Sequence, residues 1–158
     1  MRRPRQFPLL CFIIAMIAPL AMAETFTGKV VAIGDGDSLT VLTSGQKQVR
    51  IRLEGIDAPE SKQAFGSTSK KSLSELAFGR EVKVVASTTD DYGRKVAQVY
   101  LGTFWINLAQ VERGMAWHYT HYSSDPRLHA AEAYARSLKL GLWSGMNPTP
   151  PWTYRHRR

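Results

Sequence analysis

The alternation of apolar and polar positions is clearest in residues 48–54. There Val49, Ile51 and Leu53 alternate with charged residues, a period of two that is typical of a half-buried β-strand, and Gly55 ends the run. Four other segments combine apolar residues with flanking turn signals. These segments are residues 25–33, 38–42, 81–87 and 95–101. The pattern therefore predicts five short strands.

Three later segments show the spacing of an amphipathic helix instead. In residues 67–78 the apolar side chains recur at intervals of three and four, and a glycine follows where a left-handed helix end belongs. Residues 105–113 repeat this pattern. Asp125 and Pro126 then combine an N-cap residue with proline at the first helical position, which predicts a helix that extends to about Leu140.

This order of elements favours one architecture. Five strands with a helix between the third and fourth are typical of an oligonucleotide/oligosaccharide-binding (OB) barrel, here an α+β fold, mainly β, with about three helices. A five-stranded sandwich is the alternative, and the inserted helix argues against it. We expect one domain over residues 24–145. Residues 146–158 are rich in proline and then basic, and we expect this tail to be extended and partly mobile.

Residues 1–23 have the layout of a secretory signal peptide. Three arginines precede an apolar stretch, and small residues lead up to a cleavage site after Ala23. An uncleaved membrane anchor is the alternative. Pro8 and Pro19 interrupt the apolar stretch, which is also shorter than a spanning helix requires. We therefore expect a secreted or periplasmic protein with no membrane attachment after cleavage.

Loss of this leader changes the composition in two ways. It removes Cys11, the only cysteine, so the exported domain contains no disulfide and depends on its core. It also leaves 18 basic against 13 acidic residues, so the net charge falls from +8 to about +5. A modestly basic domain suits a polyanionic ligand, but it equally suits solubility. Composition alone does not choose between them.

Four acidic residues lie near strand ends: Asp35, Asp37, Asp57 and Glu60. Taken singly, each is most simply a turn former or a solvated residue. However, the start of one strand lies beside the end of its antiparallel neighbour, and this places Asp37 near Asp57. Clustered carboxylates repel one another unless a cation lies among them. Oxygen ligands of this kind prefer a hard ion such as Ca²⁺ or Mg²⁺.

Two arginines flank this acidic group. Arg52 lies on the strand that leads to Asp57, and Arg94 lies at a predicted hairpin. Alone, each is a plausible surface cation. Together, beside a divalent cation, two planar guanidinium groups form a clamp for a phosphodiester. Glu60, on the neighbouring loop, is the candidate base for an attacking water.

The chain resembles the thermonuclease (staphylococcal nuclease-like) family over residues 25–143. Four motifs carry the resemblance, in the family's order: "DGDS", "VRIRLEGIDAPE", "DDYGR" and "LAQVERGMAW". It implies a calcium-dependent endonuclease, a monomer with no stable protein partner, that cuts DNA and RNA with little sequence preference and leaves 3′-phosphate ends. It also implies that Arg52 and Arg94 bind the scissile phosphate and that Glu60 is the general base.

The resemblance further implies a calcium site and shows two departures from the family. Asp37 and Asp57 would ligate Ca²⁺ with the backbone carbonyl of Ala58, and Asp35 falls at a neighbouring acidic position. Ala58 replaces a hydroxyl residue of the best-known member, which is tolerable where only its carbonyl binds. The loop of residues 61–66 is shorter than in that enzyme, so substrate access can differ.

The candidate base-stacking residues match the family only in part. Of the two tyrosines expected against the bound nucleotide, one falls on Tyr122 and the other on Thr120. Tyr119 or His121 is the substitute, because any exposed ring can stack on a base. An alternative is that these aromatics are partly buried structural residues. The histidines of this region do not show the spacing of metal ligands.

Two other classes of function compete with the nuclease. A barrel of this kind can bind nucleic acid without cutting it. Such a binder would not need Asp37, Arg52, Asp57, Glu60 and Arg94 together. A binding module for an anionic polysaccharide would require the acidic group to be purely structural. The sequence leaves open whether DNA or RNA is the preferred substrate, and which hard divalent ion is used.

Overall fold

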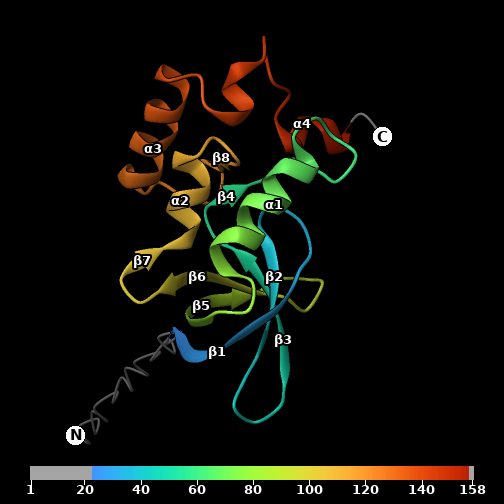
Figure 1. The fold of residues 1–158 in the computed structure, drawn as a ribbon, viewed down its shortest axis with the longest axis vertical. Coiled ribbons are helices and arrows are strands. Elements are labelled where there is room, and N and C mark those ends of the chain that lie inside the picture. The colour runs from blue at the N-terminus through green and yellow to red at the C-terminus, as the bar shows by residue number, and fades with distance from the viewer. Residues whose placement is uncertain (1–22, 157–158) are drawn as a thin grey trace, which may run out of the picture.

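The computed structural model describes residues 23–156 (Figure 1). The predicted leader, with Cys11, lies outside the described residues apart from Ala23. Within the described range, no helix is both long enough and apolar enough to span a bilayer.

Five strands form a closed barrel, as the order of the predicted elements indicates. They are β1 (Glu24–Ile33), β2 (Ser38–Leu42), β3 (Gln48–Leu53), β5 (Glu81–Thr89) and β6 (Lys95–Leu101). Antiparallel pairing gives the order β3-β2-β1-β5-β6, and a parallel pairing of β3 with β6 closes the barrel. The register of β2 and β3 places Ser38 opposite Arg52. The residue before β2 therefore lies beside the residues that follow β3.

Three very short strands were not predicted. β7 (Phe104–Trp105) extends the sheet beside β6, and β4 (Ile56–Asp57) pairs separately with β8 (Trp117–His118). Two residues are too few for a periodic pattern, and their pairing depends on tertiary contacts. The β4–β8 pair places Asp57 opposite Trp117. This joins the end of the barrel to the helical part of the chain.

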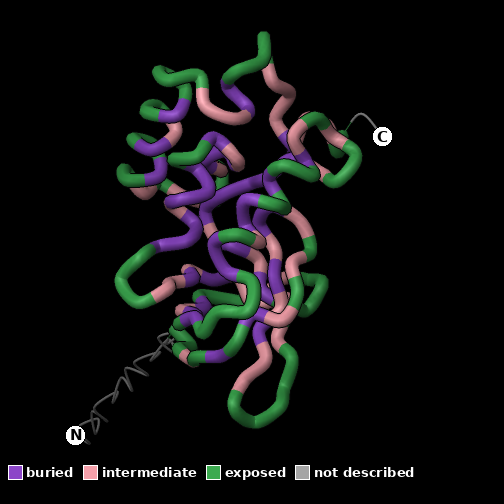
Figure 2. The backbone as a smooth tube through the Cα atoms, viewed as in Figure 1, coloured by how far each residue is buried: buried purple, intermediate pink, exposed green. Residues whose placement is uncertain are grey.

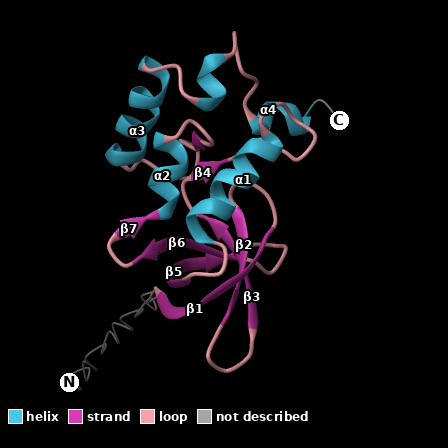
Figure 3. Ribbon diagram, viewed as in Figure 1, coloured by secondary structure: helices cyan, strands magenta, loops and turns pink. Residues whose placement is uncertain are grey.

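The helices lie on one side of the barrel (Figures 1 and 3). They are α1 (Gly66–Ala77), α2 (Ile106–Glu112), α3 (Pro126–Ser137), α4 (Pro151–His156) and a 3₁₀ turn at Gly141–Ser144. The predicted cap of α3 is confirmed, because the Asp125 carboxylate accepts a hydrogen bond of 2.8 Å from the backbone N–H of Arg127. The helix ends before the predicted Leu140. The expectation of an extended tail is wrong for the residues of α4.

The inward-facing strand residues fill the barrel. Val30, Val41, Ile51, Val84 and Val99 are fully buried. A second apolar cluster lies between the 3₁₀ turn, α3, β8 and α4, and its buried members are Trp117, Ala135, Leu142 and Trp143. Figure 2 shows the buried positions running through the barrel and the helices packed against it.

Candidate active site

The loop between β1 and β2 carries two of the predicted acidic residues. Asp35 accepts hydrogen bonds from the Ser38 hydroxyl at 2.7 Å and from the backbone N–H of Asp37 at 3.2 Å. The backbone carbonyl of Asp37 accepts a hydrogen bond of 2.7 Å from the N–H of Leu53. These bonds tighten the turn and turn the Asp37 carboxylate toward the end of β3.

Buried groups of α1 and α2 support this loop from beneath. Gln110 is fully buried, and its side-chain amide donates to the carbonyl oxygen of Gly36 at 2.7 Å. Its own amide oxygen accepts a hydrogen bond of 2.6 Å from Ser72. The loop packs so closely that a Cβ at Gly36 would collide with the Ser69 hydroxyl and lie 2.7 Å from the Cβ of Ala58. Glycine is required at this position for space.

We expect Gly36→Ala to lower both the stability and the activity of the protein. Overpacking a tight site costs about 1–3 kcal/mol in the free energy of unfolding, and the shift displaces Asp37 from Ala58. Urea unfolding and a nuclease assay measure the two effects. Gly45→Ala is the matched control, because a Cβ there meets only Thr43 Oγ1 at 3.9 Å. Equal stability of the two variants would show that the loop between β1 and β2 can accommodate a Cβ at position 36.

Arg52 joins the two predicted metal ligands. Its Nη1 lies 3.0 Å from Asp37 Oδ2, and its Nη2 lies 2.9 Å from Asp57 Oδ1. The same guanidinium donates to the backbone carbonyls of Leu53 and Ile56. The predicted proximity of the two carboxylates is therefore confirmed, with the half-buried guanidinium of Arg52 between them.

The surroundings affect the two loop carboxylates in opposite directions. Burial raises the pKa of Asp37 to about 8, and although Arg52 opposes this shift, the charges of Asp35 and Asp57 add to it. Burial also acts to raise the pKa of Asp35, but hydrogen bonds from Ser38 and from the backbone of Asp37 outweigh it, so this pKa is lowered. Asp37 is thus a buried acid whose ionised form needs more positive charge than Arg52 supplies.

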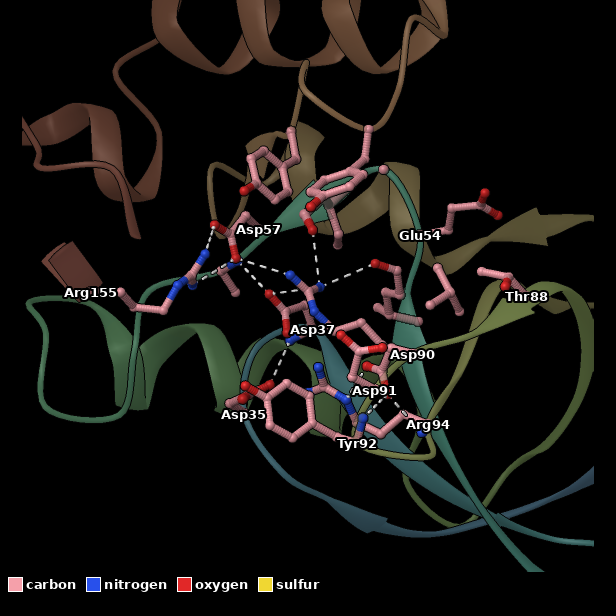
Figure 4. Close-up of a pocket in the computed structure, with 18 of the residues that line it drawn as sticks. Asp35, Asp37, Glu54, Asp57, Thr88, Asp90, Asp91, Tyr92, Arg94 and Arg155 are labelled. Carbon is pink, nitrogen blue, oxygen red and sulfur yellow. Dashed lines mark hydrogen bonds and ion pairs between the residues drawn. The ribbon is translucent and has the colours of Figure 1, made fainter. Parts of the chain in front are cut away.

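Arg94 lines the same pocket as these carboxylates (Figure 4). Glu60 is also one of the lining residues. The pocket has a volume of about 630 Å³. The Nε of Arg94 lies 2.7 Å from Asp90 Oδ2, an ion pair across the β5–β6 hairpin that holds the arginine at the pocket wall. Glu60 follows β4, and its side chain is 37% exposed. The structure therefore brings the acidic group and both arginines into one cavity.

The predicted stacking tyrosines also reach this pocket. Tyr119 and Tyr122 both line it, with an edge-to-face contact of 4.9 Å between ring centroids. Tyr122 is 69% exposed, whereas one face of Tyr119 is covered by Trp152 at a centroid distance of 5.2 Å. The His121 ring lies 4.6 Å from that of Tyr122. Tyr122 thus has the more accessible ring.

Among the pocket residues that sequence reasoning missed, Tyr92 and Arg155 have side chains that can take part in binding or catalysis. Tyr92 is 74% exposed at the hairpin, with the Arg94 guanidinium 5.4 Å from its ring centre. An aromatic residue within "DDYGR" was the available signal. Arg155, in the tail, forms ion pairs of 2.9 Å with Asp57 and 2.8 Å with Glu60. Burial acts to lower the pKa of Arg155, but the hydrogen bonds that it donates to these two carboxylates raise this pKa above its ordinary value.

The donor set fits a hard divalent cation in part. Across residues 23–156, no three histidine, cysteine or carboxylate side chains form a ready-made metal site. Asp37 and Asp57 offer two carboxylates as ligands. Backbone carbonyls, water and substrate oxygens would complete the coordination shell of the cation. Ca²⁺ and Mg²⁺ accept such mixed oxygen shells. The buried Asp37, short of positive charge, suits a cation at this position.

Comparison with known proteins places the chain among nucleases. The family model for staphylococcal nuclease homologues matches residues 50–145. A Haemophilus influenzae protein described as an uncharacterized endonuclease is 45% identical over 134 residues, which covers 85% of this chain and 75% of that protein. A Shigella flexneri protein named micrococcal nuclease is 40% identical over 153 residues, covering 90% and 87%. An Escherichia coli O157:H7 protein, also described as an uncharacterized endonuclease, is 41% identical over 155 residues, covering 98% of this chain and 99% of that protein.

Proposed function

Because the chain belongs to the staphylococcal nuclease family and is a nuclease, we propose that it cuts both DNA and RNA, with Ca²⁺ and with little sequence specificity, leaving 3′-phosphate ends. One observation carries this proposal. Asp37, Asp57, Glu60, Arg52 and Arg94 lie in a single pocket although they come from three separate parts of the chain.

Asp37 and Asp57 are the residues that would hold the cation, with the backbone carbonyl of Ala58. When bound, the cation polarises the phosphate and offsets negative charge in the transition state. The Ala58 N–H donates a hydrogen bond of 2.5 Å to Asp37 Oδ2, which fixes the orientation of this carboxylate. Arg52 contacts the same Asp37 oxygen and one oxygen of Asp57, so the spacing of the two carboxylates is set before any ligand arrives.

The two arginines bind the phosphodiester. Two N–H groups of one guanidinium match two phosphate oxygens, and such charge-assisted pairs are about twice as strong as neutral hydrogen bonds. Arg94 approaches from the β5–β6 hairpin and Arg52 from β3. As charge builds on the phosphoryl oxygens, both groups gain more in the transition state than in the ground state.

Glu60 orients the attacking water and accepts its proton. A new bond forms between the water oxygen and phosphorus, and the bond from phosphorus to the 5′-oxygen breaks, so the phosphate stays on the 3′-oxygen. The leaving 5′-oxygen takes a proton from solvent. Tyr122 and Tyr92 are exposed rings beside the pocket on which flanking bases can stack, which is a sequence-tolerant contact.

A single assay separates this proposal from a non-catalytic binder. We expect the purified protein to degrade both plasmid DNA and RNA with added Ca²⁺, and a chelator to abolish the cleavage. Mg²⁺ tests whether another hard ion can substitute. Binding of both polymers without cleavage under every ion condition would favour the binder instead.

We also propose that the protein is exported, with the leader of residues 1–23 removed and the domain of residues 24–145 followed by its basic tail. The composition of the first residues supports this proposal. The N-terminal sequence of the protein recovered from the cell envelope or the medium should begin at Glu24. Recovery only in the cytoplasm, with the leader intact, would contradict export.

A further inference from the structure

The C-terminal helix α4 lies against the loop that leads into α1 (Figure 1). Gln63 donates a hydrogen bond of 2.5 Å from its side-chain amide to the carbonyl of Thr149, just before the helix. Pro151 is buried, and Trp152 packs on the second apolar cluster. A six-residue helix is not stable alone, so α4 depends on these contacts.

Arg155 extends from this helix to Asp57 (Figure 4). The same side chain also forms an ion pair with Glu60. Its Nη2 lies 2.9 Å from Asp57 Oδ2, and its Nη1 lies 3.2 Å from Asp57 Oδ1. The same Nη1 lies 2.8 Å from Glu60 Oε1. One guanidinium thus binds both oxygens of the proposed cation ligand and one oxygen of the proposed base.

Trp152 covers a third functional candidate. Its ring is parallel to that of Tyr119, with an interplanar angle of 4° and a centroid distance of 5.2 Å. Residues three apart lie on the same face of a helix, so Trp152 and Arg155 reach the site together. A base cannot stack on the Tyr119 face that Trp152 occupies.

We propose that α4, through Trp152 and Arg155, is an autoinhibitory strap that covers the active site until a divalent cation and a nucleic-acid strand displace it together. This inference rests on the proposed function. Arg155 and the cation compete for the oxygens of Asp57, because both are positive charges. While the ion pair lasts, Arg155 occupies the Glu60 oxygen that would otherwise accept a hydrogen bond from the attacking water. The Arg155 side chain is 41% exposed, so it can be released into solvent without opening the core.

The strap makes a quantitative prediction about cation binding. A ligand that binds only the open state has its affinity reduced by the fraction of molecules that are open. Couplings of this kind typically change affinity by about 5- to 150-fold. We expect Arg155→Gln to raise the affinity for Ca²⁺ about tenfold, and Trp152→Leu to raise it in the same direction without any change of charge.

The test is calorimetric titration of the full chain with CaCl₂, together with hydrogen–deuterium exchange of residues 147–156. Arg80→Gln is the charge-matched control, because Arg80 is exposed just before β5 and lies outside the pocket. In the wild type, exchange in the strap should speed up when CaCl₂ and a phosphorothioate tetranucleotide are added together. Thermal unfolding identifies any variant that fails to fold, in which case the other variant decides.

Equal Ca²⁺ affinity in the wild type, Arg155→Gln and Trp152→Leu would overturn the strap alone and leave the proposed nuclease mechanism intact. Weaker Ca²⁺ binding in Arg155→Gln would also overturn the strap. Lower turnover without tighter Ca²⁺ binding would overturn it too, and would identify Arg155 as a substrate contact. If neither the wild type nor any variant binds Ca²⁺ at millimolar concentration, both the autoinhibitory role of α4 and the proposal that Ca²⁺ is the cofactor are refuted.

Discussion

Replacing Glu60 with glutamine should lower the turnover number on plasmid DNA by about two to four orders of magnitude, the range typical for loss of a general base. The amide keeps the size of the side chain and can still accept a hydrogen bond from Arg155, but it cannot take a proton from water. Glu60 holds neither Asp37 nor Asp57 in place. The affinity for Ca²⁺ should therefore not fall, and it should rise slightly because Arg155 loses its ion pair with Glu60.

Steady-state kinetics and calcium calorimetry measure these two quantities separately. Glu112→Gln is the matched control, because it makes the same chemical change at an exposed position of α2 outside the pocket, and its turnover should equal that of the wild type. Turnover at the wild-type rate in Glu60→Gln would show that another group activates the water.

Replacing Arg94 with lysine should lower kcat by about 10²- to 10³-fold, the cost of removing one well-placed transition-state donor. The charge is retained, but the planar fork that matches two phosphate oxygens is lost. The structure holds this fork in place through the 2.7 Å ion pair between the Arg94 Nε and Asp90. A contact that strengthens in the transition state affects kcat more than KM.

Arg80→Lys serves as the control for the arginine-to-lysine exchange, since this side chain is exposed and lies away from the pocket. Single-turnover kinetics with saturating Ca²⁺ separates the chemical step from product release. Unchanged kinetics in Arg94→Lys would argue that Arg94 attracts substrate only by its charge, and would leave Arg52 as the only phosphate fork.

Much of the fold follows from local patterns. The strict alternation around Ile51 predicted β3 to within one residue, and the Asp125 cap predicted the start of α3. Elements without a local pattern were missed. Strands β4 and β8 have two residues each, and their pairing exists because tertiary contacts bring the chain segments together. Helix α4 was missed because prolines surround it and its stability comes from docking.

The candidate site could be predicted only where one physical rule linked distant residues. Antiparallel pairing of neighbouring strands placed Asp37 beside Asp57, and the structure confirms this proximity through Arg52. No such rule applies to Arg155, which lies 98 residues from Asp57 in the chain and beyond the last strand. The stacking of Trp152 on Tyr119 could not be predicted from the sequence for the same reason. Tyr92 was visible within its motif, but its exposure depends on the shape of the hairpin.

The most direct test of the site is a crystal structure of the protein with CaCl₂ and a phosphorothioate dinucleotide. We predict Ca²⁺ at about 2.3–2.6 Å from carboxylate oxygens of both Asp37 and Asp57, as is usual for this ion. The phosphorothioate group should lie between Arg52 and Arg94, within reach of Glu60 through one water. An ion bound away from Asp37 and Asp57, or a phosphorothioate group bound outside this pocket, would contradict the account.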